Sequence, residues 1–105
     1  GHSNAFVNRL YYACFYAVSA LLLANGLTSS KHSGIRAYFH KEIVKKGVIT
    51  KETGKLYDRL FDTRQKADYA DLIRFEIEEV KPWYPEAVAF VEEIKTIAEN
   101  IINEA

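Results

Sequence analysis

The sequence predicts one all-α domain built as a small helical bundle. Apolar residues form a nearly unbroken stretch over residues 5–24, and they recur at helical spacing in three later segments. No segment alternates apolar and polar residues as a half-buried strand would. The chain has 105 residues, of which 49% are hydrophobic, so it is near the usual domain size and can fill one core.

The first helix is expected over about residues 4–25, and Gly26 supplies a left-handed residue at its end. The segment is apolar on every face, and such a helix is buried either in a membrane or inside a bundle. After the charge of Arg9, the apolar stretch continues for only fifteen residues, 10–24, whereas a membrane span needs roughly 20. We therefore expect the central helix of a soluble bundle, with Asn8 and Arg9 buried or half-buried near its start.

Three further helices are expected. The second starts near residue 30 and ends before Gly47, and the third follows an N-cap at Thr50 and loses regularity near residue 69. The last runs from residue 83 or 85 to 103, after a short turn near residues 76–81. The apolar positions expected to face the core are Ile35, Phe39, Ile43, Val44, Leu56, Tyr57, Leu60, Phe61, Ala87, Phe90, Val91, Ile94, Ile97, Ala98 and Ile101.

Charge and cysteine content narrow the possible functions. The 14 basic and 14 acidic residues cancel, so the chain as a whole is not drawn to nucleic acid or acidic membranes, and a polyanion site must be local. The single Cys14 cannot form an internal disulfide; a buried thiol in a reducing, cytoplasmic setting is expected. The sequence has no His or Cys spacing typical of a metal site and no phosphate-binding glycine loop, and no cofactor is expected.

The N-terminal end bears on the extent of the domain. The chain contains no Met, and Gly1-His2-Ser3 looks like a processed end or the remnant of a tag, so the domain is expected over residues 4–105. The first helix has more apolar surface than three partner helices would cover. A preceding helix or a second subunit is expected to cover the rest.

A polar and aromatic segment near the start of the first helix is the first candidate site. Asn8 and Tyr12 are four residues apart and share a helix face, and Arg9 shares a face with Tyr16. A guanidinium and a phenol pointing the same way suit a phosphate or a base. The alternative is a polar helix start whose side chains anchor neighbouring carbonyls.

Lys31 and His32 open the second helix, before Ser33-Gly34, and form the second candidate site. Backbone N–H groups at a helix N-terminus favour anions, and these two side chains would add positive charge beside them. Ordinary capping loops have the same composition, so both interpretations stay open.

The third candidate site is the segment Arg64-Gln65-Lys66-Ala67-Asp68-Tyr69. Arg64 and Asp68 have opposite charges at i, i+4 spacing, so Asp68 can orient the guanidinium while Arg64 neutralises a phosphate. Tyr69 would stack or hydrogen-bond. The alternative is a surface salt bridge without a ligand.

The order of these three segments resembles the HEPN family, in particular its small stand-alone prokaryotic members. The resemblance covers nearly the whole chain and rests on Asn8-Arg9-Leu10-Tyr11-Tyr12-Ala13-Cys14-Phe15, Lys31-His32-Ser33-Gly34 and Arg64-x-x-Ala67-Asp68-Tyr69. It implies an up-and-down antiparallel bundle of five helices, of which this chain would lack the first. It also implies a homodimer that binds a nucleotide or RNA, and many members act with a minimal nucleotidyltransferase in a toxin–antitoxin pair.

Ribonuclease members of this family carry an Arg followed, after four to six residues, by a His. Arg64 matches the Arg, but Tyr69 stands where the His would be at the shortest spacing, and no His follows His40. An imidazole is the natural general acid or base near neutral pH, and a phenol with a pKa near 10 is a poor replacement. A metal-independent ribonuclease would therefore depend on Arg64 with Tyr69 or His32.

Three functions stay open: a nucleotide- or RNA-binding domain, a metal-independent ribonuclease toxin, and a purely structural dimerisation domain. We expect a two-fold homodimer with its interface close to residues 64–69, because large apolar side chains of the first helix would otherwise stay exposed. Placement of Arg9 and Arg64 on opposite faces would contradict the expected cleft. That cleft is lined by Arg9, Arg64, Asp68 and Tyr69, with Asn8, Tyr12, Lys31 and His32 as further candidates.

Overall fold

Helices make up every regular element of the part of the chain that is described. The computed structural model describes the backbone of residues 2–69 and 77–104 and the side chains of residues 4–66 and 78–104. The expected all-α bundle is confirmed. Its elements are α1 (His2–Ala24), α2 (His32–Tyr38), the π-helix η1 (Phe39–Val44), α3 (Lys51–Tyr69), α4 (Ile77–Val80) and α5 (Trp83–Glu104).

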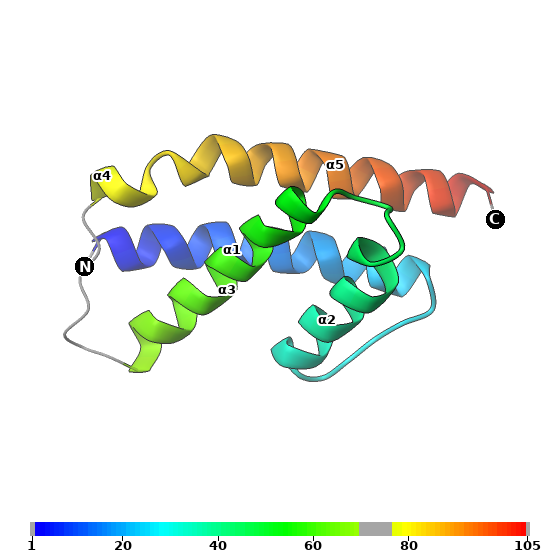
Figure 1. Cartoon of the computed structure of the whole chain (residues 1–105), viewed down its shortest axis with the longest axis horizontal. Helices are drawn as coiled ribbons and strands as arrows, with labels where there is room; N and C mark the ends of the chain where they lie inside the picture. The colour runs from blue at the N-terminus through cyan, green and yellow to red at the C-terminus, as the bar shows by residue number, and fades with distance from the viewer. Residues whose placement is uncertain (1, 70–76, 105) are drawn as a thin grey trace.

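The helices are arranged around α1 and α5, which form the most extensive helix pair (Figure 1). These two lie side by side along the long axis and run in the same direction, and α3 crosses α1 obliquely (Figure 1). The helical segment α2–η1 lies beside α3 and runs the opposite way (Figure 1). Direction therefore alternates from α2 to α3 to α5, but the α1–α5 pair is parallel, whereas a strict up-and-down order would make it antiparallel.

The end of α1 has the geometry that Gly26 predicts. Gly26 has a φ of 76°, and its N–H donates to the Leu23 carbonyl at 2.9 Å. The N–H of Leu27 reaches the Leu22 carbonyl at 2.8 Å, which completes the pair of bonds typical of a glycine-terminated helix. Glycine adopts this left-handed conformation without a Cβ penalty, so the predicted helix end is confirmed.

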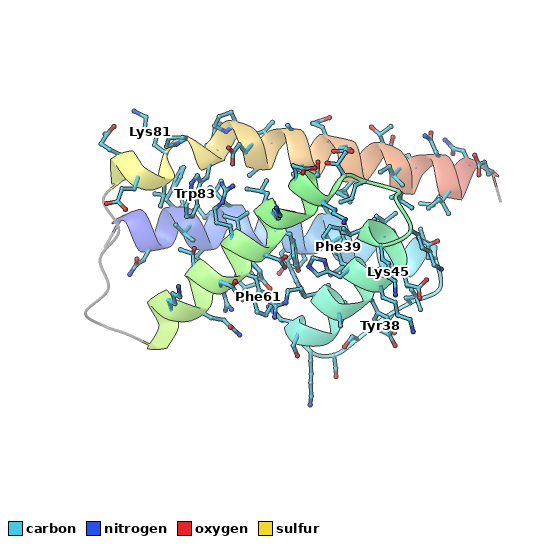
Figure 2. The ribbon with its side chains drawn as sticks, viewed as in Figure 1. Tyr38, Phe39, Lys45, Phe61, Lys81 and Trp83 are labelled. Atoms are coloured by element: carbon cyan, nitrogen blue, oxygen red, sulfur yellow. The ribbon has the colours of Figure 1, made fainter. Side chains whose placement is uncertain are left out.

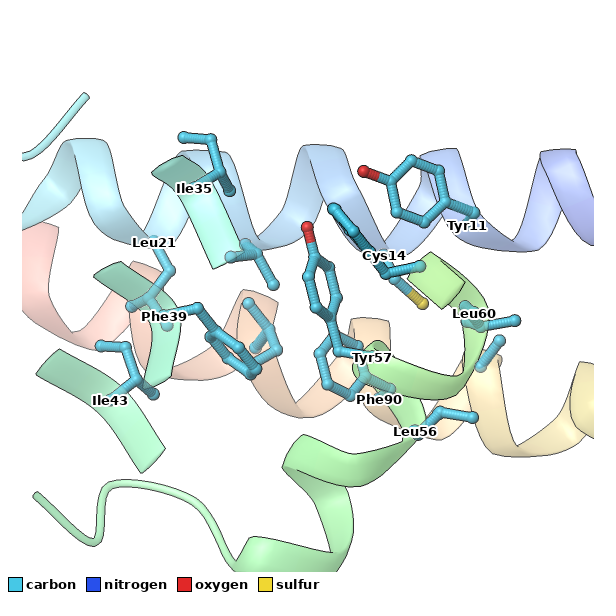
Figure 3. Close-up of a cluster of buried hydrophobic side chains, with 14 of the residues drawn as sticks. Tyr11, Cys14, Leu21, Ile35, Phe39, Ile43, Leu56, Tyr57, Leu60 and Phe90 are labelled. Atoms are coloured by element: carbon cyan, nitrogen blue, oxygen red, sulfur yellow. The ribbon is translucent and has the colours of Figure 1, made fainter. Parts of the chain in front are cut away.

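The core lies on one side of α1 and between α3, η1 and α5 (Figure 3). Most predicted core positions are buried, and Val44, Val91, Ile97 and Ile101 are partly buried against them. Trp83 is half-buried and also packs on this core, with the Arg59 guanidinium 5.4 Å from its ring centroid. The fully buried side chains include Tyr11, Cys14, Val18, Leu21, Leu22, Phe39, Tyr57, Leu60 and Ile94.

The opposite side of α1 is open to solvent. Tyr16 and Leu23 expose 65% and 62% of their surface, and Asn8 and Arg9 are exposed as well. The expectation of a buried or half-buried Asn8–Arg9 pair was therefore wrong. The open face itself is the surface for which a preceding helix or a second subunit was expected. The described helices all pack against the other half of α1.

By length and composition alone, α1 could cross a membrane. Its residues 4–24 have a mean hydropathy of 1.4, and it is the one helix of this kind in the described ranges. Length therefore does not exclude a membrane span, contrary to the sequence argument. Packing is the better guide, because Tyr11, Cys14 and Val18 are buried against the other helices, as in the core helix of a bundle.

The second predicted helix changes type at Phe39. The first part is a regular α-helix, but residues 39–44 form a π-helix, in which the Lys45 N–H donates to the His40 carbonyl five residues back, at 2.8 Å. Ile35 and Ile43 remain buried on the predicted face. The presence of this helix was predicted correctly, but the π-helical form of its second half was not.

Gly54 brings η1 close to α3. A Cβ at this position would lie 3.0 Å from Cγ2 of Val44 and 3.3 Å from Cγ1, so a side chain would push the two helices apart. The start of α3 is the predicted one, because the Thr53 N–H donates to Oγ1 of Thr50 at 3.1 Å. The cap and the glycine together fix the beginning of α3 against η1.

Candidate functional site

Arg64, in the second half of α3, is held by two side chains from α1. Its Nε donates to Oδ1 of Asn8 at 3.1 Å and its Nη2 donates to the Tyr12 hydroxyl at 2.9 Å. Its guanidinium carbon lies 5.2 Å from the ring centroid of Tyr11 and 5.0 Å from that of Tyr12. Asn8 and Tyr12 are both neutral, and their contacts orient the guanidinium.

His32, the first residue of α2, lies beside this arginine. Its Nδ1 is 2.8 Å from the Tyr11 hydroxyl, and its ring stacks on Phe15 with centroids 4.1 Å apart and planes inclined by 20°. Burial lowers the pKa of His32 below its usual 6.5, and the positive charge of Arg64 lowers it further. The imidazole is therefore neutral at pH 7 and able to accept a proton.

Tyr11 connects His32 and Arg64, because its hydroxyl contacts the imidazole and its ring contacts the guanidinium. It is fully buried, and burial raises the pKa of its phenol above 10, so it remains protonated. Tyr11 and Phe15 had no predicted role beyond the motif that carries the family resemblance. Their positions on the apolar face of α1, next to Asn8 and Tyr12, were the available signal. We refer to Asn8, Tyr11, Tyr12, Phe15, His32 and Arg64 as the Arg64 cluster.

A line of polar contacts continues from the Arg64 cluster along the seam between α2–η1 and α3. Arg36 Nη1 donates to Oδ1 of Asp62 at 3.2 Å, and its guanidinium lies 4.1 Å from the ring centroid of Phe61. Nε2 of His40 is 2.7 Å from Oδ1 of Asp58. Figure 2 shows Phe61 and Phe39 between these helices. Arg36 and His40, four residues apart, both face α3, whereas His32 packs against α1.

The structure brings together four of the eight predicted site residues: Asn8, Tyr12, His32 and Arg64. Arg9 is exposed and makes no hydrogen bond or ion pair with a described side chain. It lies about 100° around α1 from Asn8, on an adjacent face rather than the opposite one.

The remaining predicted residues are placed differently. Lys31 is exposed and is the N-cap of α2, without a side-chain capping bond. Asp68 and Tyr69 belong to the last turn of α3, but their side chains lie outside the described residues. Among the described residues, no group of three His, Cys, Asp or Glu side chains is placed to hold a metal ion.

A helical domain with a polar and aromatic cluster between α1, α3 and the start of α2 is the class that this geometry defines. The family model of the HEPN domain matches residues 1–103. The chain belongs to the HEPN family, and the expectation from its motifs is confirmed.

The relatives of this chain include bacterial and archaeal proteins. It is 52% identical over 95 residues to a UPF0332 protein of Thermotoga maritima, and the matched region spans 90% of this chain and 72% of that relative. Two proteins of Methanocaldococcus jannaschii, both named as candidate toxins, are 34% identical over 98 residues and 35% identical over 96. Each matched region spans 91% of this chain; the first spans 67% of its relative and the second 71%. No solved structure matches the chain at a significant level.

Proposed function

We propose that this domain binds single-stranded RNA through the Arg64 cluster, as the toxin-like member of a toxin–antitoxin pair. The observation that carries the proposal is the Arg64 guanidinium, which Asn8 and Tyr12 hold in a fixed orientation beside aromatic rings. A fixed guanidinium suits a phosphate, and aromatic faces suit unstacked bases. Tyr12 in turn contacts Tyr16, with ring centroids 5.9 Å apart, so the cluster borders the open face of α1.

The direct test is RNA binding measured by fluorescence anisotropy. Arg64→Ala should weaken binding of a labelled single-stranded RNA about tenfold or more, because a bound phosphate loses its oriented partner. Arg59→Ala is the matched control: Arg59 is an exposed arginine of the same helix, paired with Glu86. RNA binding by the Arg64→Ala variant equal to that of the wild type would overturn the proposal.

A second candidate function, metal-independent RNA cleavage, is favoured by the position of His32. Its imidazole is neutral near pH 7 and connects to the Arg64 side through Tyr11. With Nδ1 protonated and donating to the Tyr11 oxygen, Nε2 would accept the proton of a ribose 2′-hydroxyl, while Arg64 would stabilise the charge that develops on the phosphate. Cleavage with EDTA present, lost in both His32→Gln and Arg64→Ala, would establish the enzyme.

The family also supports a proposed partner and setting. We propose a cytoplasmic complex with a minimal nucleotidyltransferase, the kind of partner that the HEPN resemblance implies. Co-expression with a nucleotidyltransferase encoded beside this chain, followed by co-purification, tests the pairing. A purely structural role predicts a different result: thermal stability unchanged by every nucleotide and short RNA that is added.

We further propose that two copies associate through the open face of α1. Tyr16 and Leu23 place large apolar groups there, and Ala13 and Ala20 are exposed on the same face. Tyr12 lies at the edge of this face, so a second copy would border the Arg64 cluster. Light scattering at micromolar concentration should give about twice the 12.0 kDa chain mass. Tyr16→Glu with Leu23→Glu should give a monomer, and a monomeric wild type would overturn the dimer.

A further inference from the structure

A hollow outside the Arg64 cluster lies between α2–η1 and the first turns of α3. Its volume is about 560 Å³. The hollow has an apolar floor, a single carboxylate and four lysines. Its lining residues are Ala37, His40, Lys41, Val44, Lys45, Lys51, Lys55 and Asp58.

The charge of this hollow is strongly positive, although the chain as a whole is neutral. Its four lysines are exposed, and none forms a hydrogen bond or ion pair with a described residue. Lys46, directly after Lys45 in sequence, differs from them: its ammonium pairs with Glu42, four residues back. The one acidic side chain of the hollow, Asp58, is bonded to His40 at 2.7 Å. We call this hollow the lysine groove.

We infer that the lysine groove binds the phosphates of the same RNA strand whose other part occupies the Arg64 cluster. The α2–η1 segment connects the two sites. Its first residue, His32, contacts Tyr11 of the Arg64 cluster, and His40, eight residues on, lines the groove. The rise along α2–η1 from His32 to His40 is roughly 12 Å. A short stretch of single-stranded RNA spans this distance.

The chemistry of the groove favours a phosphate backbone over an acidic protein surface. Lysine ammonium groups bind phosphates as point charges without demanding one geometry. Ala37, Val44 and the lysine stems offer an apolar floor for a ribose or a base between the phosphates. Gly54 keeps η1 close to α3 beside the groove, so its two pairs of lysines, one from each helix, stay close enough to act on one strand.

The inference rests on the proposed RNA binding, and one experiment separates the two. The affinity for a labelled RNA of about 12 nucleotides is measured between about 50 and 200 mM salt for the wild type, for Lys45→Gln with Lys55→Gln, and for Arg64→Ala. The control is Lys81→Gln with Lys95→Gln, two exposed lysines from the other side of the bundle. Because each lost phosphate contact removes about 0.7 from the salt slope, the groove variant should lose about 1.4 and the control nothing.

Each outcome decides between the proposals. A groove variant with the wild-type slope and affinity, beside a weakened Arg64→Ala, overturns the lysine groove and leaves the proposed function intact. A groove variant and a control variant weakened equally also overturn it, since the effect is then general charge. A wild-type protein that binds no RNA overturns both. Circular dichroism of all variants should match the wild type, because the substituted lysines make no described contacts.

Discussion

The Tyr11 hydroxyl lies 2.8 Å from Nδ1 of His32, and the planes of the two rings are inclined by only 23°. Arg64 lies over the same phenol ring, 5.2 Å from its centroid. One buried tyrosine therefore fixes an imidazole from α2 and a guanidinium from α3 relative to each other. Because Tyr11 cannot move without disturbing the core, the cluster is built before any ligand arrives.

The stability of the fold should decrease as the pH falls below about 6.5, in part through His32. The folded-state pKa of His32 is lowered by burial and by Arg64, so the unfolded chain binds this proton more readily. The contribution of the neutral imidazole is fully present above the unfolded pKa. It is lost as the pH falls from there to the lowered folded pKa, and it changes no further below it.

This pH effect can be measured by urea unfolding between about pH 8 and 5, for the wild type and His32→Gln. The variant should lose less stability over this range. An NMR titration of the His32 ring gives its pKa directly, and Arg64→Gln should raise that pKa. A value at or above 6.5 in the wild type would contradict the assignment.

Arg64→Ala should destabilise the fold by about 1–2 kcal/mol, because it removes two hydrogen bonds and two cation–π contacts at a half-buried position. Arg64→Lys should recover only part of this, since a lysine cannot replace both directed bonds. Arg9→Ala, at an exposed position on α1, should stay within about 0.5 kcal/mol of the wild type. Chemical denaturation compares the three variants, and equal effects at positions 9 and 64 would refute the structural role of Arg64.

Gly54→Ala should destabilise the protein, although replacing glycine by alanine within a helix usually raises the free energy of unfolding by about 1 kcal/mol. The new Cβ would lie 3.0 Å from Cγ2 of Val44, and such overpacking costs about 1–3 kcal/mol. Combining it with Val44→Ala removes the clash, so the double variant should be more stable than the sum of the two single effects. Thermal melts of the four proteins complete the cycle. A stabilised single Gly54→Ala variant would show that η1 and α3 separate freely.

Cys14 should resist thiol reagents in the folded protein. It is fully buried, and burial raises the pKa of its thiol to about 12, so both access and thiolate are lacking. Reaction with a chromogenic disulfide should be slow in native buffer and rapid in denaturing urea. The rate in native buffer should be set by how often the core opens. Equal rates in the two conditions would mean that α1 leaves the core easily.

Helix ends and core faces could be predicted from sequence because they depend on local signals. Gly26 ends α1 through backbone hydrogen bonds, and the side-chain Oγ1 of Thr50 caps α3 three residues on. The apolar spacing predicted the buried faces. The π-helical form of residues 39–44 could not be predicted in this way. The spacing of Phe39 and Ile43 fits an α-helix equally well.

The candidate site was less accessible to sequence reasoning. Arg64 and Asn8 are 56 positions apart, so no spacing rule joins them, and the family resemblance supplied the relevant segments. The lysine groove escaped notice for a related reason. One pair of its lysines, Lys41 and Lys45, lies within and directly after η1, and the other pair lies on α3. Each pair alone looks like a solvated helix face. The contact between the two helices turns them into one surface.

The π-helical turn of η1 also has a consequence for how the length of this chain can vary in evolution. A π turn holds one residue more than the corresponding α turn, because its hydrogen bonds reach five residues back rather than four. Loss of one residue within 39–44 would restore a regular helix and leave both flanking segments in register. Loss of a residue elsewhere in α2 would rotate Ile35 or Phe39 out of the core. Single-residue gaps among relatives should therefore collect at η1, and homologues with such a gap should have a straight α-helix there.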